Sequence, residues 1–346
     1  MENKKIKAGI IGATGYAGAE LFRLLYSHRN VEISAVSSTS FEGKALNEVY
    51  PALTNEKEYI LTDMDGVIEN SDVIFAALPH GLSEELAAKC DGKGKVLIDL
   101  GADFRLTDEE KYTKWYGLKY KYPALHQKSL YCLPEINREK IPSVDIIANP
   151  GCYPTSIALG LMPAIKNGLV NLDSVIIDSK SGVTGAGRGL SQTTHYPDNN
   201  EAFSAYKAGL HRHTPEIEQT LSMFAGKDVK VTFVPHLLPV NRGILSTIYV
   251  KTDKTYKEIY EAYSKAYANE KFVRLQPKGS FANIKNVRCS NYCDISLHFD
   301  AHTCTLIITS AIDNMVKGAA GQAIQNMNIR FGFAEDEGLK ILAPSF

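Results

Sequence analysis

Hydrophobic positions in the first 150 residues form short apolar runs, and the segments between them have helical spacing. Leu21, Leu24 and Leu25 recur on one helical face, and residues 82–90 predict a second helix. Strands that alternate with helices favour a parallel sheet, so we expect an α/β domain here. The apolar runs predict strands within residues 5–11, 30–40, 71–81, 94–104 and 144–151.

The pattern changes after a helix that we expect to begin at about Pro154. The strands predicted beyond it are longer, with few helices between them, which is typical of a mixed or antiparallel sheet in a second, α+β domain. A last helix is predicted within residues 314–333, and residues 107–129 are polar and aromatic enough to predict a surface excursion. The longer strands are predicted within residues 171–187, 229–239, 243–252, 291–300 and 302–313.

Length and charge limit the class of protein. A chain of 346 residues favours two domains, and 44% hydrophobic and 22% charged residues are ordinary for a globular protein. The net charge of −1 comes without a block of like charge, so neither nucleic acid nor an anionic membrane is an expected partner. Apolar runs such as residues 73–78 are far shorter than the ~20 residues of a membrane span. Because no apolar signal core precedes the first strand, we expect a cytoplasmic protein.

The cysteines do not predict a metal site. There are six of them in the chain, and no C-x-x-C pair occurs. Cys289 and Cys293 have three residues between them and no second pair nearby, so no metal is expected. We expect reduced thiols, most of them buried as small hydrophobic side chains.

A glycine loop follows the first predicted strand and precedes the first predicted helix. Gly12, Gly15 and Gly18 have the spacing G-x-x-G-x-x-G in "GIIGATGYAG". Glycine lets the backbone turn tightly and pass close to a pyrophosphate, and the helix N-terminus offers N–H groups to the anion. A tight turn without a ligand is the alternative, but the strand–loop–helix setting favours a dinucleotide-binding Rossmann domain.

The end of the second strand favours NADP over NAD. An NAD site usually has an acidic residue there for the ribose diol, but "AVSSTS" has none. Its hydroxyl groups predict donors to a 2′-phosphate, from Ser37, Ser38, Thr39 and Ser40. Farther along the chain, the glycine-rich residues 181–188 predict either a loop that wraps a cofactor or substrate or an ordinary turn.

One cysteine has a distinctive setting. Cys152 in "NPGCYPTS" follows a strand and precedes Pro154, which suits the first turn of a helix. The positive end of the helix dipole there lowers the pKa of a thiol and favours the thiolate. Together with a nicotinamide fold, such a thiol indicates oxidation of an aldehyde or reduction of an activated acyl group through a thioester. A buried structural cysteine is the alternative.

The segment "HRHTPEIEQ" holds a second polar cluster. His211 and His213 precede a predicted helix with Thr214 as N-cap and Pro215 at the first helical position. A histidine whose pKa is near neutral can move the proton that hydride transfer to a carbonyl requires. An exposed helix start with incidental histidines is the alternative.

Nine motifs in order, over essentially the full chain, resemble the N-acetyl-gamma-glutamyl-phosphate reductases of arginine biosynthesis. This family belongs to a superfamily that includes aspartate-beta-semialdehyde dehydrogenase and shares the glycine loop and the thiol. The motifs are "GATGYAGAEL", "ALPHG", "DLGADFRL", "YCLPEINR", "NPGCYPTS", "SGVTGAGR", "HRHTPEI", "LLPVNRGI" and "DNMVKGAAGQAIQ".

The resemblance implies NADPH-dependent reduction of N-acetyl-gamma-glutamyl phosphate to N-acetylglutamate 5-semialdehyde and phosphate, through a thioester on Cys152. It implies His211 as the acid–base residue, with His213 as the alternative, and Glu216 as the residue that orients the histidine. The implied cofactor contacts are Gly12, Thr14, Gly15, Tyr16, Gly18, Ser38, Ser40, Pro79, Gly182, Asn314 and Gly318. The implied substrate contacts are Arg105, Asn149, His213 and Arg242.

The resemblance also implies a division of the chain. Residues 1–148 and 314–346 would form the NADP-binding Rossmann domain, and residues 149–313 the catalytic and oligomerisation domain of a homodimer or homotetramer. The alternatives are an aspartate-beta-semialdehyde dehydrogenase, a reductase of a carrier-protein-linked acyl phosphate, and a nucleotide-binding regulator. Retention of Cys152 with both histidines argues against the regulator.

Overall fold

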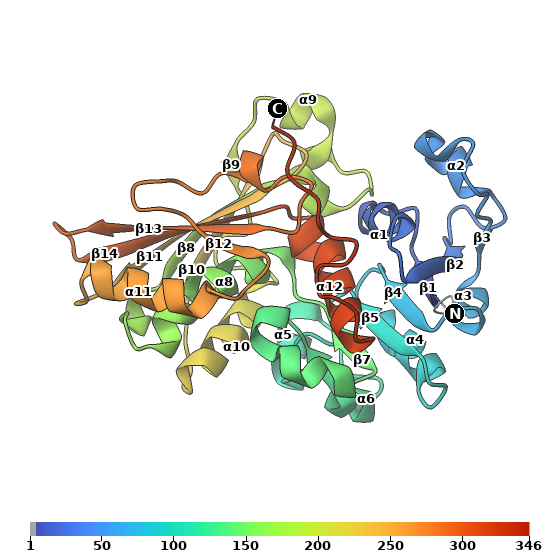
Figure 1. Cartoon of the computed structure of the whole chain (residues 1–346), viewed down its shortest axis with the longest axis horizontal. Helices are drawn as coiled ribbons and strands as arrows, with labels where there is room; N and C mark the ends of the chain where they lie inside the picture. Colours follow the sequence, from blue (N-terminus) through green and yellow to red (C-terminus); the bar gives the residue numbers. More distant parts are fainter. Residues whose placement is uncertain (1–4, 346) are drawn as a thin grey trace. The chain divides into compact units, whose positions relative to one another are not determined.

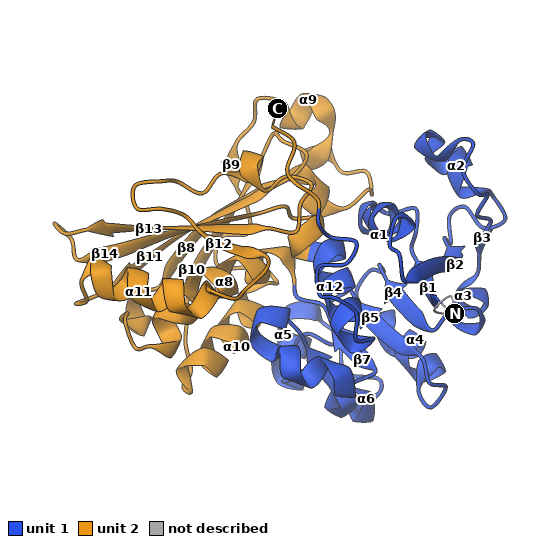
Figure 2. Cartoon of the chain, in the orientation of Figure 1, with its two compact units in different colours: residues 1–150, 319–340 blue, residues 151–318, 341–346 orange. Residues whose placement is uncertain are grey.

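The computed structural model describes residues 5–345 and divides into two compact units (Figure 1). Unit 1 contains the chain up to Pro150 and residues 319–340, and unit 2 contains residues 151–318 and 341–346 (Figure 2). The units differ from the predicted domains mainly at residues 314–318 and 341–346, which are grouped with unit 2. The reason at Asn314 is local, because its side chain bonds to the backbone of Gly243 within unit 2.

Unit 1 is built on a seven-stranded sheet in the order β3-β2-β1-β4-β5-β7-β6, and every neighbouring pair is parallel. This confirms the predicted α/β Rossmann domain. The strands are β1 (Ile6–Ile11), β2 (Val31–Ser37), β3 (Leu61–Thr62), β4 (Val73–Ala76), β5 (Val96–Asp99), β6 (Ser129–Tyr131) and β7 (Ile146–Ala148). The helices are α1 (Tyr16–Tyr26), α2 (Leu46–Val49), α3 (Met64–Glu69), α4 (Ser83–Cys90), α5 (Glu109–Tyr116), α6 (Pro123–Lys128), α7 (Pro134–Asn137) and α12 (Gly321–Arg330).

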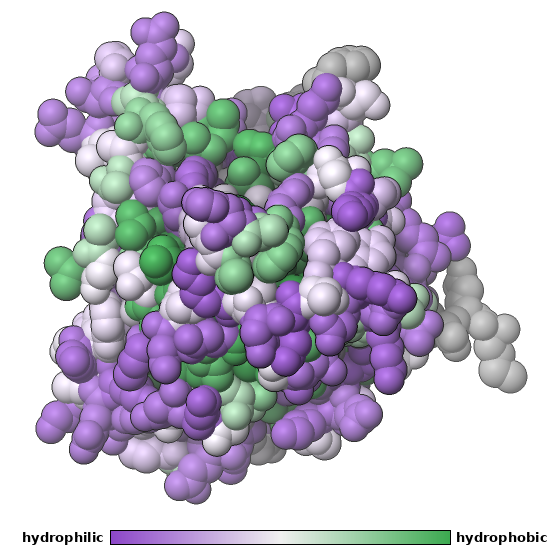
Figure 3. All heavy atoms as spheres, turned by 90° about the vertical axis from the view of Figure 1, so that its left-hand side faces the viewer, coloured by the Kyte–Doolittle hydropathy of each residue, from purple (hydrophilic) through white to green (hydrophobic). Residues whose placement is uncertain are grey.

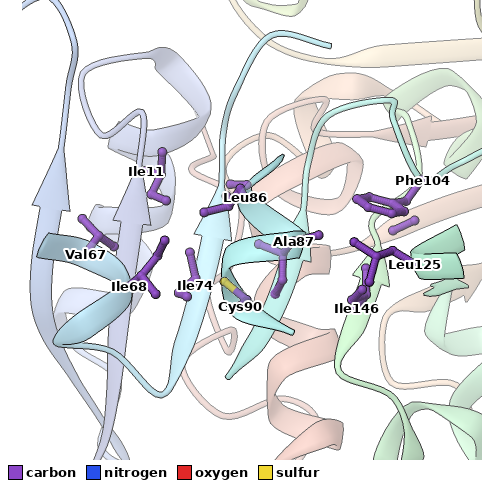
Figure 4. Close-up of a cluster of buried hydrophobic side chains, with 13 residues drawn as sticks. Ile11, Val67, Ile68, Ile74, Leu86, Ala87, Cys90, Phe104, Leu125 and Ile146 are labelled. Atoms are coloured by element: carbon purple, nitrogen blue, oxygen red, sulfur yellow. The ribbon is translucent and has the colours of Figure 1, made fainter. Parts of the chain in front are cut away.

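The core of unit 1 explains why its strands read as continuous apolar runs. All four residues of β4 and all four of β5 are buried, as expected of parallel strands that are covered on both faces. Figure 4 shows Ile74 of β4 between Ile68 of α3 and Leu86 of α4, with Phe104 and Ile146 farther along the same layer. The burial of this layer is the main force that holds the sheet and its helices together.

Helix α12 comes from the far end of the chain and completes unit 1. Its residues from Gly321 to Asn328 are all buried, including four with amide side chains. Several of these amides donate hydrogen bonds within the unit, and Asn326 Nδ2 donates to the carbonyl oxygen of Cys132 and to Asn149 Oδ1, each at 3.2 Å. Buried amides without partners would destabilise the fold, so these bonds fix the position of α12.

Unit 2 is built on a second seven-stranded sheet in the order β12-β13-β14-β11-β8-β10-β9. The pairs β8–β10 and β12–β13 are parallel and the others antiparallel, which confirms the predicted mixed sheet. The strands are β8 (Ile176–Gly182), β9 (Ser204–Ala205), β10 (Thr232–Leu238), β11 (Ile244–Lys251), β12 (Val273–Leu275), β13 (Cys293–Asp300) and β14 (Thr305–Ile312). The helices are α8 (Cys152–Lys166), α9 (Tyr196–Asn199), α10 (Thr214–Ala225) and α11 (Tyr256–Tyr267), followed by the π-helical turn η7 (Val316–Ala320).

Helix α8 lies on this sheet with α10 and α11 against it, so nearly all of its residues are buried. That explains why its sequence is apolar all round. Its position is fixed by buried hydroxyl groups, since Ser156 Oγ lies 2.7 Å from Ser246 Oγ, which in turn lies 2.8 Å from Ser179 Oγ. Tyr263 of α11 donates to the carbonyl oxygen of Gly160 at 2.6 Å. Cys152 therefore lies at the N-terminus of a helix that is held firmly on the sheet.

The segment at residues 107–129 is mostly exposed, as predicted, but it has secondary structure and two buried side chains of its own. It contains α5 and α6, and its Tyr112 and Leu125 are buried. Polar and apolar residues are interspersed on the face shown in Figure 3. Within residues 5–345, no helix is both long and apolar enough to cross a membrane.

Candidate active site

The glycine loop of unit 1 has the backbone that its spacing predicts. Gly12 has a φ of 81°, which residues with a side chain rarely adopt, and a Cβ on Gly18 would lie 2.2 Å from the carbonyl oxygen of Gly12. Gly15 is the N-cap of α1 and offers no side chain to the first N–H groups of that helix. A helix N-terminus with uncapped N–H groups can bind a pyrophosphate.

Two hydrogen bonds hold the loop from outside. Thr14 Oγ1 lies 2.7 Å from Ser38 Oγ at the end of β2, and the hydroxyl of Tyr50 donates to the carbonyl oxygen of Thr14 at 2.7 Å. Ser38 is buried, whereas Ser40 is exposed. Of these two predicted cofactor contacts, Ser38 braces the loop and Ser40 has its hydroxyl open to a ligand. Tyr50 was not predicted, because nothing in its local sequence indicates a bond to a residue so far away.

Arg105 and Asn149 join two strand ends of unit 1. Arg105 Nε donates to the carbonyl oxygen of Asn149 at 2.9 Å, and its Nη2 donates to that of Leu100 at 2.7 Å. Asn149 is 1% exposed, and its amide bonds to Ala319 and Asn326. Both residues therefore hold the end of β7, immediately before the segment that leads to Cys152.

Cys152 is the first residue of α8 in unit 2, two positions earlier than the predicted helix start. Gly151 is the N-cap and makes no side-chain bond, so the thiol lies at an uncapped helix N-terminus. The residue is only partly buried, and its thiol is not part of a disulfide. A Cβ on Gly318 would lie 2.7 Å from the Cβ of Cys152, so only glycine fits beside the thiol. Such a site favours a thiolate.

Glu216 supports the residue before the thiol. Its side chain is fully buried, and its Oε1 accepts the N–H of Gly151 at 2.8 Å. The role of Glu216 in orienting a histidine stays a prediction, and the bond described here orients the N-cap of α8. The N-cap of α10 is His213 rather than the predicted Thr214, so Glu216 lies in the first turn of α10. A carboxylate there is stabilised by the helix dipole.

His211 lies among aromatic rings. Its ring centroid is 5.5 Å from those of Tyr153 and Phe233 and 5.6 Å from that of Tyr206. Burial, with added repulsion from nearby cationic side chains, lowers the pKa of His211 to about 4. The N–H of His213 donates to His211 Nδ1 at 3.1 Å, so the proton of the neutral imidazole is on Nε2. His211 is therefore a neutral N–H donor near pH 7.

Three loops of unit 2 meet around Asn314. Its Oδ1 accepts the N–H of Gly243 at 2.8 Å, and its Nδ2 donates to Thr184 Oγ1 at 3.0 Å. Gly182 lies so close to the backbone of Asn241 that a Cβ would be 2.7 Å from its carbonyl oxygen. Nη1 of Arg242 lies 3.7 Å from Oδ2 of the buried Asp313. The predicted residues Gly182, Arg242 and Asn314 are thus brought together.

Comparison with known proteins gives this chemistry a family. Residues 7–144 match the family model for the NAD binding domain of semialdehyde dehydrogenases, and residues 152–314 match the model for their dimerisation domain. The chain is 57% identical to the N-acetyl-gamma-glutamyl-phosphate reductase of Clostridium beijerinckii over 99% of its own length and 100% of that relative. It is 56% identical to the enzyme of that name from Brachyspira hyodysenteriae, with the same coverage. The chain belongs to the N-acetyl-gamma-glutamyl-phosphate reductase family.

Solved structures extend the likeness to the fold of the wider superfamily. Aspartate semialdehyde dehydrogenase II from Vibrio cholerae superposes with a TM-score of 0.73 at 17% identity, over 95% of this chain and 99% of that one. The aspartate semialdehyde dehydrogenase from Candida albicans, solved with NADP, has a TM-score of 0.67 at 16% identity over 94% of this chain and 98% of its own. At such identities the likeness is one of fold, so the reductase family is carried by the closer relatives.

The rings around His211 are the part of the site that sequence reasoning missed. In the sequence, Tyr153 stands out only as the residue after Cys152, and Tyr206 and Phe233 lie outside every motif. Tyr153 and Tyr206 hydroxyl oxygens lie 3.1 Å apart, and burial raises the pKa of Tyr206 to about 12. Both tyrosines are therefore neutral hydrogen-bonding groups near neutral pH.

Proposed function

We propose that this protein reduces N-acetyl-gamma-glutamyl phosphate to N-acetylglutamate 5-semialdehyde, with NADPH as the reductant. The observation that carries the proposal is the position of Cys152 at an uncapped helix N-terminus, with Glu216 bonded to the preceding residue. Nearly full-length relatives named for this activity support it.

In the proposed mechanism, the Cys152 thiolate attacks the acyl carbon and the C–O bond to phosphate breaks, which leaves a thioester. NADPH, when bound by the glycine loop, would supply the hydride that reduces the thioester carbon. The alkoxide that forms collapses, the C–S bond breaks, and the aldehyde leaves with the thiolate restored. These steps need no net proton on the cysteine. A neutral hydrogen-bond donor near the developing alkoxide oxygen is then enough to stabilise it, and the Nε2–H of His211 fits that requirement.

The cofactor part of the proposal rests on the glycine loop. Gly12 and Gly18 leave space for the pyrophosphate against the N-terminus of α1. The acid-free end of β2, with Ser40 exposed, favours the 2′-phosphate of NADPH. The remaining contacts proposed for the cofactor are Thr14, Gly15, Tyr16, Ser38, Pro79, Gly182, Asn314 and Gly318.

Two arginines are proposed to bind the anionic ends of the substrate, with His213 as a further contact. Arg242 is only partly buried and forms an ion pair with Asp313. Arg105 uses Nε and Nη2 for backbone carbonyl groups, which fixes the plane of its guanidinium group. Asn149 then acts through Arg105 rather than by direct contact. A cytoplasmic location and a homodimer or homotetramer stay predictions.

The reverse reaction tests the proposal. NADP⁺ reduction by the purified protein should require phosphate together with N-acetylglutamate 5-semialdehyde, and should be far slower with aspartate semialdehyde. Equal or faster rates with aspartate semialdehyde would instead indicate a dehydrogenase of that substrate. Activity only with a substrate attached to a carrier protein would indicate the carrier-linked reductase.

A further inference from the structure

A turn beside the glycine loop has exposed side chains and a firmly held backbone. It follows β4, and the N–H of Ala77 donates to the carbonyl oxygen of Ile11 at 2.9 Å. A Cβ on Gly12 would lie 2.4 Å from the carbonyl oxygen of Ala77, so the turn and the glycine loop are in contact. Pro79 and His80 are exposed at its tip. Both side chains therefore lie at the surface of the unit, with the ring centroid of His80 5.7 Å from that of Tyr116.

The turn lacks a capping side chain of its own. Gly81 has a φ of 90°, and Leu82, the N-cap of α4, makes no side-chain bond to the helix. The missing acceptor comes from Asp103 in the loop after β5. Asp103 Oδ1 accepts the N–H of Gly81 at 2.6 Å, and Oδ2 accepts the N–H of Ser83 at 2.8 Å. One buried carboxylate therefore caps α4 and fixes the turn.

A second carboxylate braces the same point. Ser83 Oγ donates to Asp99 Oδ1 at 2.7 Å, and Asp99 also accepts the N–H of Gly101 at 2.8 Å. Burial, with a further contribution from the charge of Asp103, raises the pKa of Asp99 to about 6. Two buried carboxylates so close together destabilise a fold unless each is well bonded. Asp103 is well bonded, because the hydroxyl of Tyr112 also donates to it at 2.9 Å.

The place of the turn in the sheet indicates what it does. Strands β1 and β4 are neighbours, and β2 and β3 lie to one side of them while β5, β7 and β6 lie to the other. In open parallel sheets, ligands bind outside the carboxyl ends of the strands at the point where the strand order reverses. The glycine loop and the turn at Pro79 follow β1 and β4 at that point.

We propose that Asp103 is a positioning residue for the cofactor, which holds the turn at residues 79–81 in the conformation that NADPH binding requires. The inference rests on the proposed function, since it takes NADPH as the ligand of unit 1. Asp103 acts through Gly81 and Ser83 and does not itself contact the cofactor. An asparagine there would keep one acceptor oxygen and turn its NH₂ group toward one of the two backbone N–H donors, so the turn would shift.

The test is NADPH binding, measured by fluorescence titration of the full-length protein. Asp103→Asn should raise the Kd for NADPH at least about tenfold. Asp108→Asn is the matched control, because Asp108 also accepts two backbone N–H groups, from Glu110 and Lys111, but caps α5 instead. The control should bind NADPH within about twofold of the unchanged protein. At saturating NADPH, kcat of Asp103→Asn should stay near normal while KM for NADPH rises, a split that general loss of stability does not produce.

Two further variants keep the inference testable if Asp103→Asn does not fold. Gly81→Ala strains the turn directly, and Tyr112→Phe removes one donor to Asp103; both should raise the Kd for NADPH, Gly81→Ala more. If folded Asp103→Asn binds NADPH as the unchanged protein does, or if Asp108→Asn weakens binding equally, the inference is wrong. If the unchanged protein does not bind NADPH, the proposed function itself fails.

Discussion

At the scale of single residues, a carboxylate close to Cys152 bonds to the backbone. A negative charge beside Cys152 would oppose a thiolate, yet Glu216 is fully buried and bonded to the N–H of Gly151. That hydrogen bond, together with the positive end of the α10 helix dipole, offsets much of the negative charge of Glu216. Glu216 therefore fixes the turn that presents the thiol while the uncapped N-terminus of α8 favours the thiolate.

The first prediction concerns the thiol itself. Cys152→Ser should keep the fold and NADPH binding but lower kcat on the order of 10³-fold or more, because a hydroxyl group has almost no anionic form near pH 7. The measurements are steady-state kinetics and mass spectrometry after iodoacetamide, which should label Cys152 first and do so less when substrate is present. Cys304→Ser changes an exposed cysteine in the β13–β14 turn and is the control. Normal turnover by Cys152→Ser would exclude a thioester on this residue.

The second prediction follows from the lowered pKa of His211. In the unfolded chain its pKa returns to about 6.5, so between pH 6.5 and 4 the unfolded chain binds a proton that the folded protein does not. Stability is therefore lost as the pH falls through this window, by about 2 kcal/mol at pH 5. His211→Asn should lose correspondingly less stability between pH 7.5 and 5 in urea unfolding. The exposed His302→Asn is the control, and an equal loss in all three proteins would contradict the assignment.

At the scale of elements, the end of β2 is proposed to select the cofactor. Ser38 is occupied with Thr14, whereas Thr39 and Ser40 are exposed, so the hydroxyl group of Ser40 is one of two open to a 2′-phosphate. Ser40→Asp places a negative charge there and should raise the Kd for NADPH about tenfold or more, with a smaller effect on NADH. Titration with both cofactors measures this, and Ser143→Asp, the same change at an exposed site elsewhere in unit 1, is the control. Equal losses for NADPH and NADH would place the 2′-phosphate away from Ser40.

The elements also show which parts of the structure are local enough to predict from sequence. Five of the seven strands of unit 1 were predicted because parallel strands buried on both faces are continuous apolar runs, whereas the two short strands β3 and β6 were missed. The glycine loop was predicted because its spacing sets its own backbone. Helices α5 and α6 were not, since a few buried residues such as Tyr112 and Leu125 leave only a weak pattern among polar neighbours. The bond from Gly151 to Glu216 joins residues 65 positions apart, so no local signal could have indicated it.

At the scale of the whole molecule, the chain leaves unit 1 after Pro150 and returns to it at Ala319. The two segments meet at their ends, since Asn149 Nδ2 donates to the carbonyl oxygen of Ala319 at 3.2 Å. The returning segment brings α12, whose Asn328 bonds to His28 at 2.9 Å and whose Arg330 pairs with Asp145 at 2.8 Å. Unit 1 is therefore one folded unit made from two distant parts of the sequence.

The last prediction follows from this discontinuity. A chain ending at Pro150 would lack α12 and would expose the apolar surface that Ile324 and Met327 cover. It would also lose the hydrogen bond between the side chains of Asn149 and Asn326. Burial of two such side chains is worth roughly 3–6 kcal/mol, comparable to the whole stability of many domains. Residues 1–150 alone should therefore fail to unfold cooperatively in urea.

Joining Pro150 to residues 319–340 through a short Gly–Ser linker should restore cooperative unfolding and NADPH binding. The same joined chain with Asn326→Leu, which removes the bonds to Cys132 and Asn149 at nearly constant volume, should be less stable. Cooperative unfolding of residues 1–150 by themselves would show that α12 is not required for the unit.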